Sequence, residues 1–483
     1  MKLLCSNLQF LICLMARDGP RRQLSLVMPL LLVFLSVSIP AGAAKPLRYE
    51  LDVQLDPGRQ HIAVTGQVSL QIEEGESVLS FHLHETFLVA ECAVNGVPAH
   101  CTRARPALPG AVPTSRQVTV ELPEAVDRGP LDLEIRYHGV IRNLPGWGDP
   151  AAEGPFQDDS AGPDRVELAL YSSWYPFFAF GPTFSVEMDV ALPRGWVVTC
   201  LGREVNRREL QDEATTRWKA QSVNDVLIIA SPRFRSMDVE TAAGRVQILH
   251  TRLPEHYLRR EAQETEQTLL LFGKILGDTT GNQLVRHVYS PRNWGQGFSR
   301  PGMIVMSEGR VLMALAEDSD ASLVHGNAHE AAHFWWRFGS GQGDWINESF
   351  AEYFAILAVR AVRGEGPFRD DLEKKRNAVR ALPEYAPALA VVPFSNDGHG
   401  YTIRYQKGAL MLDAFREHMG DAGFFSASRS FYEAIKDRSV GTEEFRAHWK
   451  EVLKNDDLLS TWLDSPGGMP VSPDESTSLS NPL

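Results

Sequence analysis

The spacing of apolar residues changes partway along this chain of 483 residues. From Tyr49 to about Val239, apolar and polar residues alternate in short runs separated by Gly, Pro and Asn-Gly pairs. This alternation predicts antiparallel strands, because successive side chains of a strand point to opposite faces. From Glu255 onward the apolar residues follow the period of an amphipathic helix. The sequence therefore predicts a multidomain α+β protein, in which a β-sandwich precedes a domain whose second half is helical.

The pattern also places the individual elements. Strands are predicted at residues 49–55, 68–72, 118–122, 131–137, 184–192, 225–230, 283–289 and 303–307. Helices are predicted at residues 255–276, 321–338, 345–362, 405–419, 424–435 and 442–453. The Gly-, Pro- and Asp-rich stretch 144–164 is predicted to be a loop. The aromatic cluster Trp174–Phe178 is interpreted as core filling, with a wall of a substrate site as the alternative.

The balance of charges excludes one class of function. The chain has 48 Lys and Arg against 61 Asp and Glu, which gives a formal net charge of −13 at pH 7. Proteins that bind nucleic acid through its phosphates need clustered positive charge, so no nucleic-acid partner is expected. The 43% hydrophobic and 23% charged residues are ordinary for a folded globular chain and exclude a disordered one.

The N-terminal segment has the pattern of a secretory signal. Leu24–Ala44 carries no charged residue, follows Arg21 and Arg22, and ends in small residues. A basic flank, an apolar stretch and an Ala-x-Ala end predict cleavage near Ala43 and export to a periplasmic or extracellular location. The alternative is an uncleaved segment that anchors the protein to a membrane, because such an apolar stretch is long enough to span one.

Three cysteines follow this segment. Cys92 and Cys101 flank an Asn-Gly hairpin turn, which fits a local disulfide in an oxidising compartment. Even pairing about that turn sets Cys92 opposite Ala99, so the bridge is compatible with the hairpin but not required by it. Cys200 is interpreted as a small buried hydrophobic residue.

His329, Glu330 and His333 form a His-Glu-x-x-His motif within a segment of helical pattern. Two histidines four residues apart lie on the same face of a helix, one turn apart, so both imidazoles can bind one Zn²⁺ ion. Glu330 lies beside that face, where it can act as a general base without being a ligand. His325 shares the face and is interpreted as a solvated or supporting histidine.

A carboxylate for the third ligand follows in the segment Asp344–Tyr353, which begins a second helix after a short Gly-rich turn. Because the turn is short, the two helices are expected to be antiparallel neighbours, with a Glu of the second helix facing the histidines. Two His and one Glu leave the fourth zinc position open for water, which is typical of catalytic rather than structural zinc.

These residues together resemble the gluzincin zinc metallopeptidases of the aminopeptidase N and leukotriene hydrolase family. The resemblance covers about residues 46–470. Tyr49–Val53 is similar to the start of the family's saddle-like β-domain, Trp174–Pro176 to its short bacterial members, and Tyr405–Ala409 to its Tyr-x-Lys-Gly helix start. The resemblance implies a thermolysin-like catalytic domain, one zinc ion per chain and a peptide or protein substrate. It also implies that Tyr405 stabilises the tetrahedral intermediate.

The spacing to the third ligand departs from the family pattern. In the family, 18 residues separate the second His from the ligand Glu, and here that count leads from His333 to Glu352. The motif context Asn-Glu-x-Phe-Ala instead selects Glu348, after only 14 residues. We favour Glu348 as the ligand, because residues can be deleted from the turn without changing the helix face. Glu352, one turn later, is then a supporting carboxylate or the rival ligand.

A second departure concerns the substrate anchor. The family holds the free amine of the substrate with the Glu of a Gly-x-Met-Glu-Asn strand, and the alignment on Gly297 puts Arg300 in that place. A cation there would repel an ammonium group. Two interpretations of Arg300, a candidate substrate-binding residue, follow. In one, another carboxylate, Glu308 or one from the β-domain, holds the amine of an unusual aminopeptidase substrate. In the other, Arg300 faces away from the amine or contacts carbonyl or carboxylate groups, and selection for a free N-terminus is weak.

The sequence thus predicts four parts: a leader at 1–44, an N-terminal β-domain at 45–245, a thermolysin-like zinc peptidase domain at 246–470 and a flexible tail at 471–483. The function predicted is an aminopeptidase-like zinc metallopeptidase. The alternatives are a zinc endopeptidase or other hydrolase that does not need a free N-terminus, and a family member without turnover that acts as a binding protein.

Overall fold

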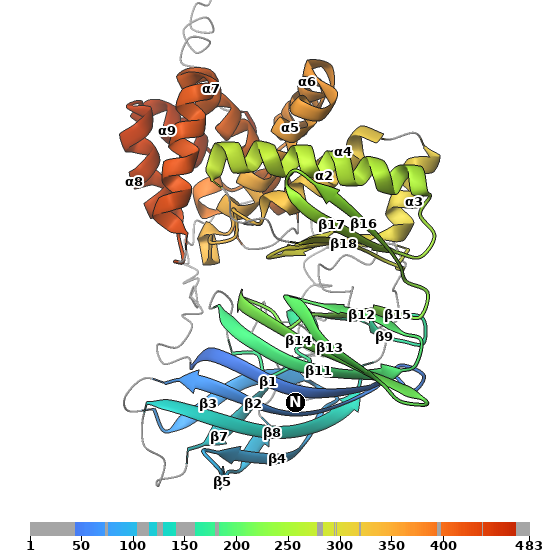
Figure 1. Cartoon of the computed structure of the whole chain (residues 1–483). Coiled ribbons are helices and arrows are strands. Elements are labelled where there is room, and N and C mark those ends of the chain that lie inside the picture. The colour runs from blue at the N-terminus through green and yellow to red at the C-terminus, as the bar shows by residue number, and fades with distance from the viewer. Residues whose placement is uncertain are drawn as a thin grey trace, which may run out of the picture. The chain divides into compact units, whose positions relative to one another are not determined.

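The structure is a computed structural model of the whole chain, shown in Figure 1. It describes the following residues: 44–72, 76–103, 115–122, 129–141, 160–178, 183–277, 284–293, 295, 297–317, 320–393, 398–436 and 438–469. The predicted leader and tail lie outside these residues, apart from Ala44, and so does most of the predicted loop 144–164. Within the described residues, no helix is both long and apolar enough to cross a membrane.

An eight-stranded sheet is the largest element of the N-terminal half, and its strands are ordered β13-β14-β11-β1-β2-β8-β4-β5. Their bounds are β1 (Lys45–Asp56), β2 (His61–Gln71), β4 (Leu88–Val94), β5 (Val97–Pro98), β8 (Pro130–Val140), β11 (Phe184–Pro193), β13 (Arg203–Glu209) and β14 (Glu213–Val223). The alternation of apolar and polar residues in the sequence gives this sheet one buried and one exposed face. In β1, for example, every second residue from Tyr49 to Leu55 is buried.

One pairing in this sheet differs from the antiparallel arrangement that the sequence predicts. β1 pairs with β11 in parallel, with Tyr49 opposite Val186 and Val53 opposite Val190. These strands are more than a hundred residues apart in the sequence. A connection of that length can return the chain in either direction, whereas the short hairpins that the sequence shows only allow antiparallel neighbours.

Two smaller sheets complete the N-terminal half. One is ordered β3-β7-β6 and the other β12-β15-β10-β9. Their bounds are β3 (Val78–His84), β6 (Cys101–Arg103), β7 (Ser115–Glu121), β9 (Ser160–Ala161), β10 (Val166–Leu168), β12 (Val197–Cys200) and β15 (Ile228–Ser231). Side chains of all three sheets meet in one apolar core, where Trp174 and Tyr175 are fully buried. Cys92 and Cys101 form a disulfide, and Cys200 is a buried free thiol.

A five-stranded sheet begins the second half, in the order β16-β17-β18-β20-β19. Its strands are β16 (Arg235–Thr241), β17 (Gly244–His250), β18 (Val285–Ser290), β19 (Phe298–Arg300) and β20 (Met303–Ser307). The boundary predicted between residues 245 and 246 falls inside β17. The strand β19 pairs only with β20 and is an edge of this sheet.

Helices make up most of the remaining chain (Figure 1). They are α2 (Glu255–Leu276), α3 (Glu308–Ala316), α4 (Asp320–Ala332), α5 (Trp345–Arg363), α6 (Glu365–Arg380), α7 (Gly408–Ile435), α8 (Thr442–Leu453) and α9 (Asp456–Asp464). The predicted bounds of α2 and α8 are correct, and the predicted break between two helices corresponds to Gly420 inside α7, at a φ of 74°. A second apolar core, with Phe272, Trp336 and Phe350, joins the helices. The fold class read from the sequence is confirmed.

Candidate active site

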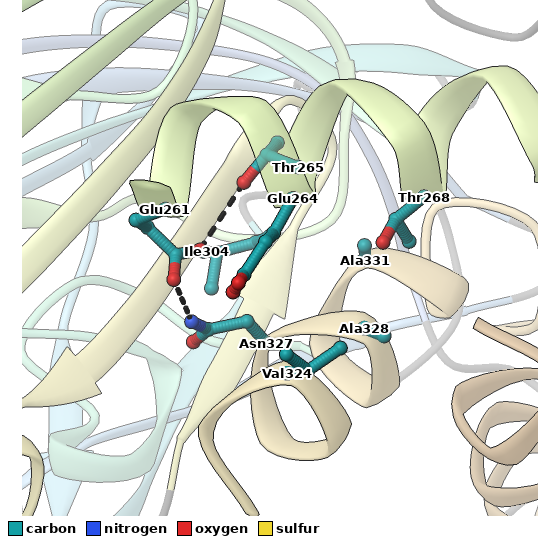
Figure 2. Close-up of a pocket in the computed structure, with 9 residues that line it drawn as sticks. All are labelled: Glu261, Glu264, Thr265, Thr268, Ile304, Val324, Asn327, Ala328 and Ala331. Atoms are coloured by element: carbon teal, nitrogen blue, oxygen red, sulfur yellow. Dashed lines mark hydrogen bonds between the residues drawn. The ribbon is translucent and has the colours of Figure 1, made fainter. Parts of the chain in front are cut away.

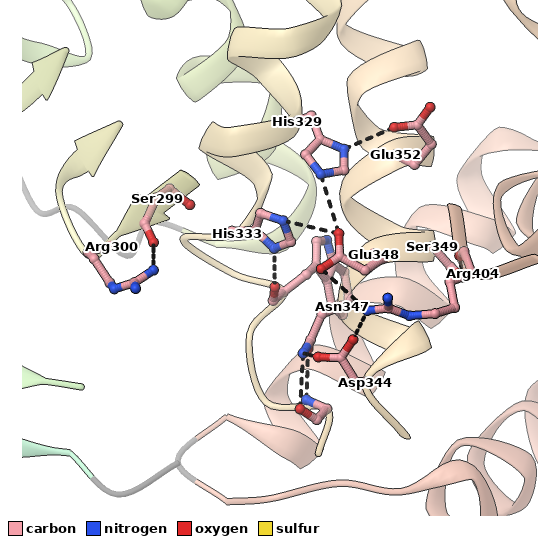
Figure 3. Close-up of polar contacts among 12 residues, drawn as sticks. Ser299, Arg300, His329, His333, Asp344, Asn347, Glu348, Ser349, Glu352 and Arg404 are labelled. Atoms are coloured by element: carbon pink, nitrogen blue, oxygen red, sulfur yellow. Dashed lines mark hydrogen bonds and ion pairs between the residues drawn. The ribbon is translucent and has the colours of Figure 1, made fainter. Parts of the chain in front are cut away.

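Neighbouring helices α4 and α5 bring His329, His333 and Glu348 together. The Nε2 atoms of His329 and His333 lie 3.5 Å and 3.6 Å from Oε2 of Glu348. One possible ligand atom from each of the three residues lies within 4.8 Å of the others, and no other group of this kind occurs in the described part of the chain. Figure 3 shows the three side chains pointing toward one another.

The other ring nitrogen of each histidine has a hydrogen-bond acceptor. Nδ1 of His329 lies 3.0 Å from Oε2 of Glu352, and Nδ1 of His333 lies 2.8 Å from the carbonyl oxygen of Trp336. Both acceptors hold a proton on Nδ1, so Nε2 is the ring nitrogen of each histidine that could offer a lone pair to a metal ion. Hydrogen bonds of this kind orient histidines that bind metals.

The donor set fits a zinc ion. Two imidazole nitrogens and one carboxylate oxygen are the ligands of many catalytic zinc sites, in which a fourth position takes water or substrate. Oε2 of Glu348 is buried and has no hydrogen-bond partner in the described structure, which is costly for a carboxylate oxygen unless a cation is bound.

Glu352 lies one turn farther along α5 and does not join this group of ligand atoms. Its carboxylate contacts the far nitrogen of His329, Nε2 of His325 at 3.2 Å and Nζ of Lys375 on α6 at 2.6 Å. The geometry therefore groups Glu348 with the two histidines and puts Glu352 behind them. His325 contacts Glu352 and is not part of the group of possible ligands in the described residues.

The shortened spacing has a local cause. The helix α4 ends at Ala332, six residues before the predicted end at Phe338, so that His333 lies just past the helix. The turn that follows is closed by Asn347, which accepts a hydrogen bond from the amide of Gly339 at 2.7 Å and donates one to its carbonyl at 3.0 Å. A side chain at Gly339 would collide with the carbonyl of Gly343, so the chain can turn tightly here only with glycine. The early end of the helix brings α5 back within fewer residues.

Glu330 is buried next to β19. A Cβ atom added at Gly297 would lie 2.8 Å from Oε1 of Glu330, so the backbone at the start of this edge strand passes close to the carboxylate. Burial raises the pKa of Glu330, an effect that the nearby histidines oppose. A raised pKa suits a carboxylate that accepts a proton near neutral pH.

Tyr405 belongs to a π-helical turn, Thr402–Lys407, which precedes α7 at the place where the sequence predicts an ordinary helix start. Its ring stacks on the imidazole of His329 at 5.6 Å between centroids and 10° between planes. Burial and the neighbouring Glu348 raise the pKa of Tyr405 well above its ordinary value. The phenol therefore keeps its proton and can donate a hydrogen bond.

Arg300, at the end of β19, is held by the N-terminal half of the chain. Its Nε donates to Oδ2 of Asp225 at 2.8 Å, and both residues are buried. Phe298 and Tyr171 flank the guanidinium at 5.2 Å and 5.4 Å. The carboxylate of Asp225 neutralises the cation, which weakens the repulsion of an ammonium group expected from the sequence. Nη2 remains buried without a hydrogen-bond partner in the described structure.

Three charged residues near the site were missed by sequence reasoning: Asp344, Lys375 and Arg404. Lys375 pairs with Glu352, and Arg404 pairs with Asp344 (Figure 3 shows the Arg404 contact). Asp344 precedes the Asn-Glu motif and Arg404 precedes Tyr405, so adjacency to motif residues is the only signal that the sequence offers. The pairings themselves join residues far apart in the chain.

Comparison with known proteins gives independent information. Residues 287–463 match the sequence profile of the Peptidase family M1 domain. Searching curated protein sequences gave no match. The fold is similar to that of an M1 zinc metallopeptidase from Deinococcus radiodurans, with a TM-score of 0.67 and 18% identity over 89% of this chain and 96% of the other.

Two further solved structures have the same likeness. One is a Glu-to-Ala mutant of the Deinococcus radiodurans enzyme bound to a Tyr-Ser-Ala substrate, with a TM-score of 0.66, 18% identity and coverage of 89% and 97%. The other is a two-domain M1 zinc metallopeptidase mutant bound to L-tryptophan, with a TM-score of 0.68 at the same identity and coverage. Together with the profile match, these comparisons identify residues 287–463 as a peptidase family M1 domain, and they give the chain the fold of the M1 zinc metallopeptidases.

Proposed function

We propose that the protein is a zinc-dependent peptidase that hydrolyses peptide bonds, with His329, His333 and Glu348 as the zinc ligands. The observation that carries this proposal is the convergence of three ligand atoms within 4.8 Å, one of them a buried carboxylate oxygen without a hydrogen-bond partner in the described structure. A zinc ion bound there supplies a Lewis acid to the reaction.

Two residues of the chain then handle the proton and the developing charge. Glu330 accepts a proton from the attacking water and later delivers it to the leaving amine, for which its buried position and raised pKa are suited. Tyr405 donates a hydrogen bond to the oxyanion that forms from the scissile carbonyl, because its phenol stays protonated. The stacking of Tyr405 on His329 places this donor next to the ligands.

For the substrate, we propose peptides cleaved in an aminopeptidase-like manner. Support comes from the structurally similar proteins, of which one holds a Tyr-Ser-Ala substrate and another an amino acid. Arg300 lies on β19, the strand beside Glu330, and forms an ion pair with Asp225. This ion pair favours a second candidate function, a zinc endopeptidase that does not need a free N-terminus. In that case the edge of β19 would accept the backbone of an internal peptide segment.

We also propose that the protein is exported and that residues 1–44 are its cleaved leader. The disulfide between Cys92 and Cys101 supports this location, since such bonds persist in oxidising compartments. N-terminal sequencing of the protein purified from its native host would test it: a mature N-terminus near Lys45 is expected, and one at Met1 would contradict the proposal.

A peptide-library digest tests the peptidase function. The protein is incubated with mixed peptides, half of them N-acetylated, with and without a zinc chelator, and the products are identified by mass spectrometry. We expect cleavage that the chelator stops and added zinc restores. The Glu330→Gln variant is the control for contaminating peptidases. An absence of chelator-sensitive cleavage at wild-type zinc content would contradict the proposal.

A further inference from the structure

Arg404 connects two parts of the proposed zinc site. Its Nη2 forms an ion pair with Oδ2 of Asp344 and lies 3.9 Å from Oε1 of Glu348 (Figure 3). Arg404 is 4% exposed, so these charges interact with little screening by water. The guanidinium thus lies on the side of the Glu348 carboxylate opposite to the oxygen that faces the histidines.

The backbone of Arg404 is fixed to the helix that carries Glu348. Oγ of Ser349 donates a hydrogen bond to the carbonyl of Arg404 at 2.7 Å. A Cβ atom added at Gly408 would lie 1.8 Å from the same Oγ, so the start of α7 touches α5 as closely as glycine permits. The carbonyl released by the π-helical turn is the one that Ser349 binds. The position of Arg404 relative to Glu348 is therefore set by the backbone as well as by its side chain.

The same residue contacts the ring that the proposed mechanism needs. The guanidinium carbon of Arg404 lies 5.7 Å from the centre of the Tyr405 ring, and that ring in turn stacks on His329. A substitution of Arg404 would consequently affect both Glu348, a proposed ligand, and Tyr405, the proposed donor to the oxyanion.

The other two proposed ligands are histidines, and in each of them Nδ1, the ring nitrogen that does not face the metal position, has a hydrogen-bond partner. His329 has Glu352 and His333 has the carbonyl of Trp336. The Glu348 carboxylate has the phenol of Tyr405 as a hydrogen-bond partner, and Arg404 is a cation that lies 3.9 Å from its Oε1. Arg404 thus adds a positive charge on this side of Glu348, with Asp344 balancing it.

On this geometry, and resting on the zinc peptidase function proposed above, we propose that Arg404 is a positioning residue for Glu348. It holds Oε2 toward the two histidines and slows the loss of zinc from the site, and Asp344 holds Arg404 in place. Residues that support metal ligands in this way commonly change metal affinity by roughly 10- to 100-fold when they are replaced.

The experiment measures how fast zinc leaves the full-length, zinc-loaded protein after addition of a chromogenic chelator at neutral pH. We expect Arg404→Gln to release zinc on the order of 10- to 100-fold faster than the wild type. Arg404→Lys should restore part of the retention, because an ammonium group keeps the charge but not the fork of donors. Asp344→Asn should give a smaller acceleration than Arg404→Gln.

Arg416 provides a matched control. It is also a largely buried arginine of the same region, pairs with Asp413 at 2.9 Å and donates to the hydroxyl of Tyr353 on α5 at 2.6 Å, but it contacts no proposed ligand. Arg416→Gln should lower thermal stability and leave the rate of zinc release within about threefold of wild type. Equal acceleration in both glutamine variants would overturn the proposal, because a general loosening of α5 would explain it.

The outcomes separate this inference from the proposed function. A wild-type protein that binds no zinc would contradict the function itself. A wild-type protein that binds zinc, with unchanged release from Arg404→Gln, would overturn only the role of Arg404. If Arg404→Gln does not fold, Arg404→Lys and Asp344→Asn decide, and wild-type release from both would overturn it. In variants still loaded with zinc, we also expect kcat to fall more than KM rises, since Tyr405 is displaced from the transition state rather than from bound substrate.

Discussion

The helix α4 separates two buried polar regions with different properties. On one face, His329 meets Glu348 at 3.5 Å, and Oε2 of Glu348 has no hydrogen-bond partner in the described structure. On the other face, shown in Figure 2, Asn327 donates to Glu261 of α2 at 2.5 Å, and Thr265 bonds to Glu261 at 3.2 Å. The contacts of Glu348 with the two histidines are too long for strong hydrogen bonds, whereas the hydrogen bonds of Glu261 to Asn327 and Thr265 are shorter.

This difference in hydrogen bonding indicates which of the two polar clusters is arranged to bind an ion. Buried polar groups that hydrogen-bond to one another hold elements together, and the bond from Asn327 to Glu261 joins α2 to α4 in this way, although Oδ1 of Asn327 has no hydrogen-bond partner in the described structure. Three ligand atoms that converge within 4.8 Å without short hydrogen bonds among them are instead arranged for an ion. Of these two clusters, the one with His329, His333 and Glu348 is therefore the one expected to bind an ion.

The largest effect is expected from removing the proposed ligand itself. Glu348→Ala should lose zinc on dialysis and with it all measurable activity, because only two ligands remain. Glu352→Ala should keep most of its zinc, with an affinity lowered by about 10- to 100-fold, since His329 loses its orienting carboxylate. Zinc is measured by atomic emission after dialysis. Equal losses, or a greater loss from Glu352→Ala, would assign the ligand role to Glu352.

The next effect concerns residues that act on the reaction without binding the metal. Glu330→Gln and Tyr405→Phe should contain zinc at the wild-type ratio and lose activity on the order of 10²-fold or more, because each removes an interaction made in the transition state. The measurement is kcat on a cleavable peptide together with zinc content. Near-normal turnover of Tyr405→Phe would leave this tyrosine with a packing role only.

A smaller effect on activity is expected from changing the N-terminus of the substrate, which concerns Arg300 on β19. Because the carboxylate of Asp225 is already paired with Arg300, acetylation of a peptide's N-terminus should change kcat/KM by less than about tenfold. The comparison uses one peptide with and without the acetyl group. Complete loss of cleavage on acetylation would show that an amine anchor exists elsewhere, and would remove the argument for an endopeptidase.

The region behind α4 should affect stability rather than catalysis. Burial raises the pKa of Glu261 to about 7, so the folded protein binds a proton there that the unfolded chain has released above about pH 4.5. This contribution to stability is present at low pH and is lost as pH rises toward and through 7. Burial lowers the pKa of His287, which lies 3.4 Å from Glu261, to about 4, and its contribution to stability rises with pH, opposite in sign to that of Glu261.

Glu261→Gln therefore should gain stability relative to wild type as pH rises, by about 1 kcal/mol per unit between pH 5 and 7, with zinc content and kcat nearly unchanged. Denaturant unfolding at pH 5, 6, 7 and 8 measures the difference. A difference that does not depend on pH would mean that Glu261 is ionised in the folded protein over this whole range.

Features that depend on neighbours in the sequence could be predicted. The period of the apolar residues predicts α2 and α8 with their bounds, and the His-Glu-x-x-His spacing alone sets His329 and His333 one turn apart. The choice between Glu348 and Glu352 rested on motif context, since counting residues assumes a turn of fixed length. That turn begins where α4 ends, at Ala332, and is closed by the hydrogen bonds between Asn347 and Gly339.

Features that depend on distant residues could not be predicted. The parallel pairing of β1 with β11 and the pairing of Arg404 with Asp344 join segments that no local pattern connects. The same holds for Asp225. Its carboxylate pairs with Arg300, so that this residue is part of a buried ion pair and not a free cation. The helices α3, α6 and α9 were missed although each has an amphipathic pattern of apolar residues, so these three were omissions of the sequence analysis.

The π-helical turn at Thr402–Lys407 has a consequence for engineering this protein. A π turn is a wider and less stable form of helix, which holds one residue more than the regular form. Shortening it by one residue would offer an obvious gain in thermal stability. The same deletion would rotate the residues before α7 by about a quarter turn relative to α5. Tyr405 would then no longer stack on His329. Thermostable variants selected without an activity screen should therefore accumulate changes in these six residues, at the expense of turnover.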